Sequence, residues 1–335
     1  MSERIGVIGA GSWGTTLADL LARKGHEVTL WGFEPDLVDE LRATGVNSRF
    51  LPDIPLSPCL NYSNSLPQAA ADAGLLLFVS PTQVMRSVLQ QLLPHLPTGI
   101  PLVSASKGIE LETLLTMSQL FRELLPPARH REIAVLSGPS FAREVARQIP
   151  TAVTVAATDD AVARQVQRAF TTDCFRVYTN GDLVGVELGG AIKNVIALAA
   201  GISDGLGFGH NTRAALITRG LAEMSRLGRA LGADPATFAG LAGMGDLVLT
   251  CTGDLSRNRS VGLRIGQGES LSAILTSMTM VAEGVKTAQS AWMLAQRHGV
   301  EMPIIEQVYR IIHEGKSARQ AVIELMTRNP KAEGV

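Results

Sequence analysis

The sequence lacks the features that mark several classes of protein. It has only three cysteines among 335 residues, Cys59, Cys174 and Cys251, with no CxxC or Cys/His pair. This argues against a disulfide framework and a zinc site, and we expect no metal. The 30 Lys and Arg residues balance the 31 Asp and Glu residues, so no general basic field attracts nucleic acid or an anionic membrane. An anionic substrate would need a local cluster of positive side chains.

Long hydrophobic runs are also missing. The longest purely apolar stretches, such as Val195 to Ile202, are too short to span a bilayer. The first expected strand begins almost at Met1, which leaves no room for a secretory signal. We therefore expect a cytoplasmic protein without a membrane span. Its length and its hydrophobic fraction of 46% indicate a globular chain of two domains.

The first half of the chain alternates short apolar runs with helical segments. We expect strands at residues 5–8, 28–31, 75–79, 102–104, 133–136, 152–156 and 175–178, and helices at 15–24 and 36–43. Apolar strands separated by helices indicate a parallel sheet covered on both faces. From residue 183 on, apolar residues recur at helical spacing over 183–203, 212–231, 281–298, 304–313 and 318–328, with no convincing strand. The second half is therefore predicted to be all-helical.

A glycine turn, Gly9-Ala10-Gly11-Ser12-Trp13-Gly14, follows the first strand and opens a helix. In a dinucleotide site, Gly9 would permit the tight turn, Gly11 the approach of a pyrophosphate, and Gly14 the packing of the helix on the strand. The alternative is a turn that is merely rich in glycine, but the strand before it and the helix after it favour the dinucleotide site. The predicted fold is α/β, with a Rossmann-type doubly wound sheet at residues 1–185 and a helical substrate domain at 186–335. Such a fold is typical of a nicotinamide-dependent dehydrogenase.

The residues at the end of the second strand do not decide between NAD and NADP. NAD-selective sites place an Asp or Glu roughly 20 residues beyond the glycines. Here the strand ends in Trp31-Gly32-Phe33-Glu34, so the carboxylate is missing at its usual place and Glu34 comes late. Neither is an arginine adjacent to bind a 2′-phosphate, although Arg49 could fold back. We expect NADP or NAD, with NADPH favoured.

Two polar segments directly follow expected strands, whose carboxyl ends face the ligand crevice in such sheets. In the first, residues 104–108, Lys107 would meet an anionic substrate or the cofactor; the alternative is a solvated lysine at a helix start. In the second, residues 138–142, Ser140 is either a helix N-cap or part of the crevice.

The segment 189–200 is a helix of small and apolar residues, interrupted only by Lys193 and Asn194. A helix that is apolar on most faces is normally buried. Its lysine must then extend to solvent, form an ion pair, or lie in a cavity with a lowered pKa. A partly desolvated ammonium beside a carbonyl acts as a general acid in reduction.

Two loops of the second half add candidates. Residues 243–246 combine glycines, which permit unusual backbone angles, with the carboxylate of Asp246. Residues 256–259, Ser-Arg-Asn-Arg, suit a phosphate, because arginine binds it through two parallel hydrogen bonds. A solvated polar loop is the alternative for both.

Together these segments resemble the bacterial NAD(P)-dependent glycerol-3-phosphate dehydrogenase family. The matching stretches occur in order over nearly the whole chain: residues 9–14, 47–52, 106–108, 137–142, 185–188, 193–194, 201–205, 211–215, 241–251, 256–259 and 283–284. The resemblance implies reduction of dihydroxyacetone phosphate to sn-glycerol 3-phosphate, which supplies the backbone of phospholipids.

The resemblance also implies roles for individual residues. Lys193 would be the catalytic acid and base. The residues that would surround the substrate are Lys107, Gly138, Ser140, Lys193, Asp246, Ser256, Arg257 and Asn258. Those that would contact the cofactor, beside Gly9, Gly11 and Gly14, are Ser12, Trp13, Phe33, Arg49, Lys107, Ala142, Arg257, Val281 and Glu283. Relatives often carry a polar or basic residue at the Phe33 position, so Phe33 weakens the case for NADP.

Two other functions remain open. A related reductase of a hydroxy or keto acid would not need the phosphate-sized pair Arg257 and Asn258. A redox sensor would bind NAD(P) without turnover and would not need a buried Lys193. Apolar helical surfaces in the second half also lead us to expect a homodimer.

Overall fold

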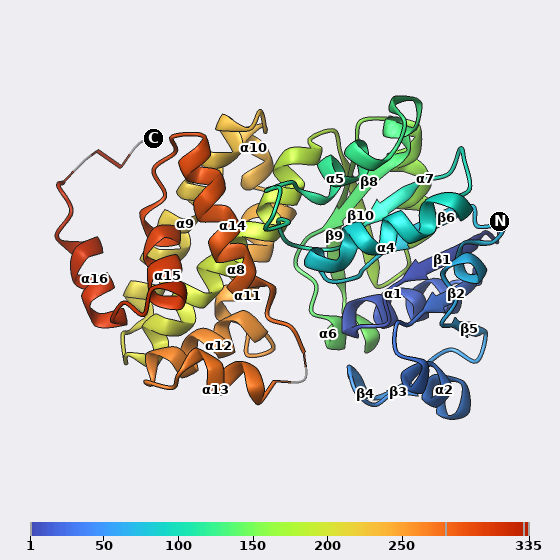
Figure 1. Ribbon diagram of the computed structural model, residues 1–335, viewed down its shortest axis with the longest axis horizontal. Coiled ribbons are helices and arrows are strands. Elements are labelled where there is room, and N and C mark those ends of the chain that lie inside the picture. The colour runs from blue at the N-terminus through green and yellow to red at the C-terminus, as the bar shows by residue number, and fades with distance from the viewer. Residues whose placement is uncertain (1, 279, 331, 334–335) are drawn as a thin grey trace. The chain divides into compact units, whose positions relative to one another are not determined.

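The computed structural model describes residues 2–278, 280–330 and 332–333. The chain divides into two compact units, the first comprising the residues up to Lys107 and Leu115–Val186, the second Gly108–Leu114 and the residues from Glu187 on (Figure 1). The excursion at 108–114 is held within the second unit by side chains of one helix. The Ser290 hydroxyl donates to the Ile109 carbonyl oxygen (3.2 Å), and Arg297 donates to that of Thr113 (3.4 Å). Sequence position alone had assigned this segment to the first domain.

The first unit is built on an eight-stranded sheet in the order β10-β9-β8-β7-β6-β1-β2-β5. The strands are β1 (Arg4–Ile8), β2 (Glu27–Trp31), β5 (Leu60–Ser63), β6 (Leu75–Phe78), β7 (Leu102–Ser104), β8 (Ile133–Ser137), β9 (Thr151–Ala157) and β10 (Phe175–Asn180). Every strand expected from the sequence is present. The edge strand β5 and the small antiparallel pair β3 (Val46–Asn47) and β4 (Leu51–Pro55) were not expected, because they are short and carry no continuous apolar run.

The expectation of a wholly parallel sheet is wrong at one pair of strands. Strand β9 runs antiparallel to β8, with Ser137 opposite Thr154, whereas the other pairs of this sheet are parallel. A parallel return needs a crossover, usually a helix lying over the sheet. The connection from β8 to β9 contains only the five-residue helix α6 (Ala142–Ala146), which packs against α1 (Ser12–Arg23). The chain therefore turns back beside β8.

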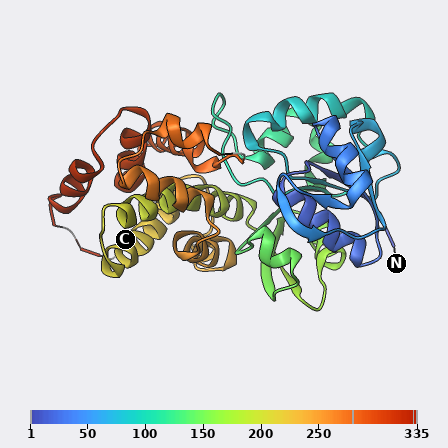
Figure 2. The same cartoon turned by 90° about the horizontal axis from the view of Figure 1, so that it is seen from below.

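Helices cover both faces of the sheet, as Figure 2 shows, and make it doubly wound. Leu17 and Leu21 of α1 and Phe170 of α7 (Asp160–Phe170) are buried in one core cluster. Leu89 of α4 (Met85–Leu92) and Phe121 of α5 (Met117–Leu124) are buried in the other. The remaining segments are α2 (Pro35–Thr44), α3 (Leu66–Ala70) and 3-10 turns at Thr82–Val84, Leu93–His95 and Pro127–Glu132. The predicted fold class is confirmed.

Among the described residues after Asn180, all regular structure is helical. These residues include nearly all of the second unit. Its helices are α8 (Leu183–Gly205, whose first turn lies in the first unit), α9 (His210–Ala230), α10 (Pro235–Phe238), α11 (Asp246–Thr252), α12 (Arg257–Gly266), α13 (Leu271–Thr276), α14 (Glu283–Arg297), α15 (Pro303–His313) and α16 (Ala318–Met326), with a π-helical turn at Leu241–Gly245. The five long segments expected from periodicity correspond to α8, α9, α14, α15 and α16. The shorter helices α10 to α13 were not expected.

Helix α8 is the core helix of this unit. It is long and apolar enough to cross a membrane, but 94% of its apolar window is buried inside the protein. Glycines bring α12 against it. A Cβ atom at Gly201 would lie 2.0 Å from the Arg259 carbonyl oxygen, and one at Gly262 would lie 2.2 Å from that of Leu198. Because only glycine permits this approach, the two backbones touch, and the start of α12 is fixed beside α8.

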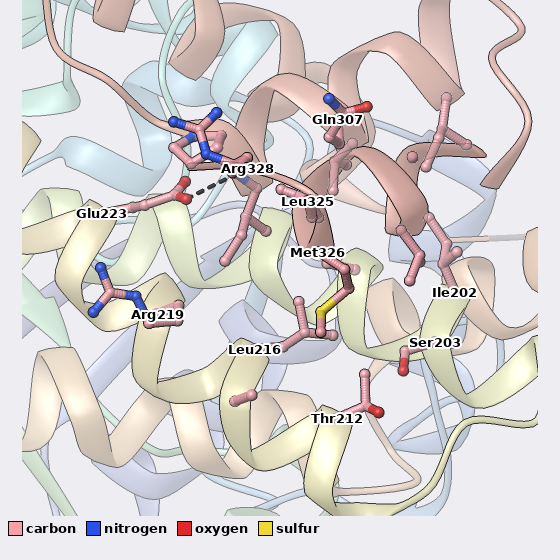
Figure 3. A pocket seen from close by; sticks show the side chains of 18 of the residues that line it. Ile202, Ser203, Thr212, Leu216, Arg219, Glu223, Gln307, Leu325, Met326 and Arg328 are labelled. Atoms are coloured by element: carbon pink, nitrogen blue, oxygen red, sulfur yellow. Dashed lines mark hydrogen bonds between the residues drawn. The ribbon is translucent and has the colours of Figure 1, made fainter. Parts of the chain in front are cut away.

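A cavity of about 470 Å³ lies among α8, α9, α15 and α16 (Figure 3). Its wall includes Glu223 of α9, which is 1% exposed. The Glu223 carboxylate accepts the backbone N–H groups of Ile304 (2.8 Å) and Ile305 (3.2 Å), in the first turn of α15. These N–H groups have no partner within their own helix, so Glu223 caps α15 from a neighbouring helix. Burial raises the pKa of its carboxyl to about 7, against the lowering effect of these hydrogen bonds.

Candidate active site

The glycine turn of the first unit has the geometry that a dinucleotide needs. Gly9 has a φ of +125°, and a Cβ atom at Gly14 would lie 1.9 Å from the Gly9 carbonyl oxygen, so both positions require glycine. Gly11 is the N-cap of α1, and a Cβ atom there would meet nothing within 4 Å. The helix N-terminus is therefore open at Gly11, with no side chain capping it. These features fit a pyrophosphate.

Asn47 holds this turn in place. The side chain is fully buried, and its amide donates to the Ala10 carbonyl oxygen (2.9 Å) and to the Thr15 hydroxyl (2.8 Å). The sequence marked Asn47 only as part of a matching stretch. Ser12 and Trp13 form the first residues of α1, and the buried indole N–H of Trp13 has no hydrogen-bond partner among the described residues.

Lys107, Gly138 and Ser140 meet within the first unit, which fits the prediction that both segments follow strands ending at the same edge of the sheet. The Lys107 ammonium and the Ser140 hydroxyl each donate to the Gly138 carbonyl oxygen, both at 2.9 Å. Gly138 has a φ of +139°, and a Cβ atom there would lie 2.9 Å from Val153 Cα. The N-cap interpretation of Ser140 is wrong: α6 begins at Ala142, after Phe141, without a side-chain cap.

At the end of β2, the Phe33 side chain is 77% exposed and packs edge-on against Trp31, with ring centroids 6.3 Å apart. Near this point, Arg49 is already engaged by a carboxylate. Its guanidinium forms an ion pair with Asp36, the second residue of α2, at 2.6 Å. Asp36 and Asn47 contact residues of this predicted site but were not singled out from the sequence.

In the second unit, Lys193 is 7% exposed and forms an ion pair. Its ammonium lies 2.9 Å from Asp246 Oδ1 and donates to Thr250 Oγ1 at 2.8 Å. The Thr250 hydroxyl in turn donates to the Asp246 carbonyl oxygen at 2.6 Å. Of the three possibilities for a lysine in an apolar helix, extension to solvent is wrong and pairing is confirmed. Thr250 was missed, although its spacing of four residues from Asp246 places both on one face of α11.

Glycines explain how Asp246 reaches Lys193. Gly189 lies one turn before Lys193 on α8, and a Cβ atom there would lie 2.4 Å from the Ala242 carbonyl oxygen. Gly243 lies equally close to the chain before it, since its Cβ atom would lie 2.1 Å from the Phe238 carbonyl oxygen. The π-helical turn can therefore pack directly on α8, and α11 begins at Asp246 beside the lysine.

Two asparagines extend this cluster toward the predicted phosphate loop. The Asn258 amide donates to Asn194 Oδ1 (2.9 Å), and Asn258 Oδ1 accepts the backbone N–H of Gly284 (3.0 Å). Both asparagine side chains are buried. Ser256 is the N-cap of α12 and accepts the N–H of Arg259 at 3.2 Å. The loop is thus fixed on α8 and α14 rather than solvated.

The two arginines of this loop differ. Arg259 forms ion pairs with Asp204 and Asp254, both at 2.9 Å, so its charge is used within the fold. Arg257 is exposed as a whole, and no hydrogen bond or salt bridge engages its guanidinium within the described ranges. Surrounding protein desolvates this guanidinium and lowers its pKa, while the charge of Glu283 acts in the opposite direction. Arg257 is therefore the arginine that remains available to an anion.

Val281 is 55% exposed just before Glu283, the first residue of α14. Among the residues that the structure describes, no group of three or more His, Cys, Asp or Glu side chains could hold a metal ion.

A Rossmann-type unit with an open glycine turn, followed by a helical unit with a buried, paired lysine, defines a nicotinamide-dependent dehydrogenase. Comparison with known families agrees. The model described as NAD-dependent glycerol-3-phosphate dehydrogenase N-terminus matches residues 4–163, and the model of the C-terminus of the same enzymes matches residues 182–323. The chain belongs to the NAD-dependent glycerol-3-phosphate dehydrogenase family and is an NAD(P)-dependent oxidoreductase.

Individual relatives are similar over the full length. The proteins named glycerol-3-phosphate dehydrogenase (NAD(P)+) from Geobacter metallireducens and from a Geobacter species are 69% and 68% identical, covering 99% and 100% of both chains. The crystal structure of glycerol-3-phosphate dehydrogenase from Coxiella burnetii is 42% identical, covers 98% of this chain and 99% of its own, and has a TM-score of 0.91.

Proposed function

We propose that the protein catalyses the reversible, NAD(P)-dependent reduction of dihydroxyacetone phosphate to sn-glycerol 3-phosphate, which supplies glycerophospholipid synthesis. The names of the relatives support the reaction. The observation that carries the mechanism is the buried Lys193, paired with Asp246 and Thr250. In this proposal residues 1–185 bind the dinucleotide, and residues 186–335 hold the substrate.

When bound, the nicotinamide supplies the hydride, and the chain's residues position the dinucleotide. The open N-terminus of α1 at Gly11 receives the pyrophosphate, with Ser12 and Trp13 beside it. Lys107, whose ammonium is already oriented by Gly138, adds positive charge. The proposed cofactor contacts further include Phe33, Arg49, Ala142, Arg257, Val281 and Glu283.

Lys193 is the proposed acid in reduction and base in oxidation. As a hydride reaches the ketone carbon, negative charge develops on the oxygen, and a buried ammonium stabilises and then protonates it. Asp246 pairs with the ammonium and Thr250 accepts a hydrogen bond from it, so the fold fixes the position of the ammonium. Lysine thereby supplies the electrophilic charge that a metal supplies in other dehydrogenases.

Arg257 is proposed to bind the substrate phosphate, together with Ser256 and Asn258. Its guanidinium is available, and Asn258 is fixed by Asn194 and Gly284. Binding energy from the phosphate, remote from the reacting carbon, then orients the carbonyl at Lys193. Gly138 and Ser140 are proposed as further substrate contacts.

The assembly and location are also proposals. Several apolar side chains are exposed on the second unit, among them Val248, Leu275, Ile323 and Met326. Such surfaces support a homodimer. A cytoplasmic location fits an enzyme whose longest apolar helix is buried in its own core.

The experiment is an initial-rate assay with purified protein, dihydroxyacetone phosphate and NADH or NADPH, followed at the nicotinamide absorbance band. We expect loss of absorbance with the phosphorylated ketone and none with unphosphorylated dihydroxyacetone or a keto acid at equal concentration. Turnover of the keto acid alone would favour the related reductases. Cofactor binding without any turnover would favour a redox sensor.

A further inference from the structure

The side chains around the end of β2 form a charged cluster that bears on cofactor selectivity. In this fold the end of the second strand receives the adenosine ribose, because the glycine turn beside it holds the pyrophosphate. Here β2 ends at Trp31 and α2 begins at Pro35, so Asp36 lies in the first turn of α2 at this end of the sheet. Arg49 reaches the same place from the segment after β3.

Arg49 is the positive member of the cluster, paired with one carboxylate and influenced by the charges of two more. Its guanidinium pairs with Asp36 at 2.6 Å. The charges of Asp36, Glu34 and Glu40 all raise the pKa of this guanidinium. Glu40 also accepts the backbone N–H of Ser48, the neighbour of Arg49, at 3.1 Å. With one positive and three negative side chains, the cluster carries a net negative formal charge.

We expect this arrangement to bind NAD and NADP with different affinities. NADP carries a 2′-phosphate of nearly two negative charges where NAD carries a hydroxyl. The phosphate would have to take Arg49 away from Asp36 and enter a cluster that is already negative. A hydroxyl adds no charge, and it can donate a hydrogen bond to a carboxylate.

We propose that Asp36 is a specificity-determining residue, which withholds Arg49 from a 2′-phosphate and so favours NAD(H). The proposal rests on the dinucleotide site of the proposed function. It also reverses the preference for NADPH that the sequence suggested, since the carboxylate missing from Trp31 to Phe33 is replaced by one that enters from α2. Because the Asp36 side chain is 68% exposed, its effect is of moderate size.

The test measures cofactor binding without turnover, by fluorescence titration of NADH and NADPH in the absence of substrate. In Asp36→Asn, Arg49 is released, and we expect the Kd of NADPH to fall about tenfold while that of NADH changes less than about twofold. Adding Arg49→Ala to Asp36→Asn should abolish the gain. The matched control is Asp39→Asn, which removes an exposed, arginine-paired carboxylate from the same helix.

An unchanged ratio of the two dissociation constants in Asp36→Asn would overturn the proposal. So would an equal shift in Asp39→Asn, because the effect would then be one of general charge. The binding measurement does not depend on turnover. If the unaltered protein binds both cofactors but does not reduce dihydroxyacetone phosphate, the proposed function fails, and the preference for NADH or NADPH can still be measured. If it binds neither cofactor, the dinucleotide site and this proposal both fail. A thermal melt of each variant checks that it is folded.

Discussion

The ammonium of Lys193 and the carboxylate of Asp246 lie 2.9 Å apart, and both side chains are almost fully buried. Each charge therefore depends on the other for its stability within the second unit, since removing one partner of a buried pair leaves the other uncompensated. This couples the proposed catalytic role of Lys193 to folding. A loss of activity on substitution has to be separated from a loss of structure.

A double substitution makes that separation. Lys193→Met alone should abolish turnover, with kcat reduced at least about a thousandfold, and should destabilise the fold by about 3 kcal/mol, because the buried Asp246 carboxylate loses the positive charge of Lys193. Adding Asp246→Asn should restore most of the stability and none of the activity. Thermal unfolding and the absorbance assay measure the two effects. Recovery of activity with stability would remove Lys193 from the catalytic role.

Thr250 is expected to act as a positioning residue for Lys193. Thr250→Val keeps the shape and loses the hydroxyl that accepts from the ammonium at 2.8 Å. We expect kcat to fall by about 10- to 100-fold at little changed KM, since misdirection of a general acid costs rate more than binding. Thr250→Ser keeps the hydroxyl and should recover most of the rate. Equal rates for the Val and Ser variants would show that the hydroxyl has no such role.

The contrast between Lys193 and Thr250 shows what the sequence could reveal. A lysine in a helix of small apolar residues stands out, because burial of an unpaired charge is costly and demands an explanation. Threonine is an ordinary residue in a helix, and only the fold shows that Thr250 meets Lys193, 57 positions away. The role of Asn47 could not be predicted either, since its contact with the glycine turn depends on the unexpected segment β3–β4.

The fold, too, could be predicted only where the sequence itself carries a distinct pattern. Strands and long helices could be predicted because their apolar residues recur with a fixed period. The reversed direction of β9 could not, because the apolar run from Thr151 to Ala157 is compatible with either direction. The pairing of Arg49 was hidden for a related reason: Asp36 is 13 positions away, and only the path of α2 brings the two together.

Two glycines of the turn should respond differently to the same substitution. Gly14→Ala places a Cβ atom 1.9 Å from the backbone oxygen of Gly9, so the turn must shift and the melting temperature should fall by several degrees. Gly11→Ala places its Cβ atom in open space, so the fold should be nearly unaffected. Because that space is where we place the pyrophosphate, cofactor affinity should fall at least about tenfold. Unchanged affinity in Gly11→Ala would contradict the proposed position.

The last prediction concerns Glu223, which faces the cavity of Figure 3 and caps α15. Burial raises the pKa of its carboxyl from 4.5 to about 7 in the folded protein. The folded state therefore binds a proton that the unfolded state releases between these two values. By linkage, the contribution of this group to stability is fully present below about pH 4.5 and is lost as the pH rises to about 7.

The expected loss is about 3 kcal/mol in the free energy of unfolding, from about 1.4 kcal/mol for each pH unit of difference. Urea unfolding at a series of pH values from 4.5 to 8 measures it. In Glu223→Gln the side chain cannot titrate, so the decline should vanish, leaving a lower stability near pH 5 because the amide presents a donor to one of the two N–H groups of α15. The control is Glu306→Gln, which removes a glutamate of α15 that is 32% exposed and paired with Arg310, and should leave the decline in place. A decline that persists in Glu223→Gln would assign it to other groups, and the cap would then be ionised throughout this range.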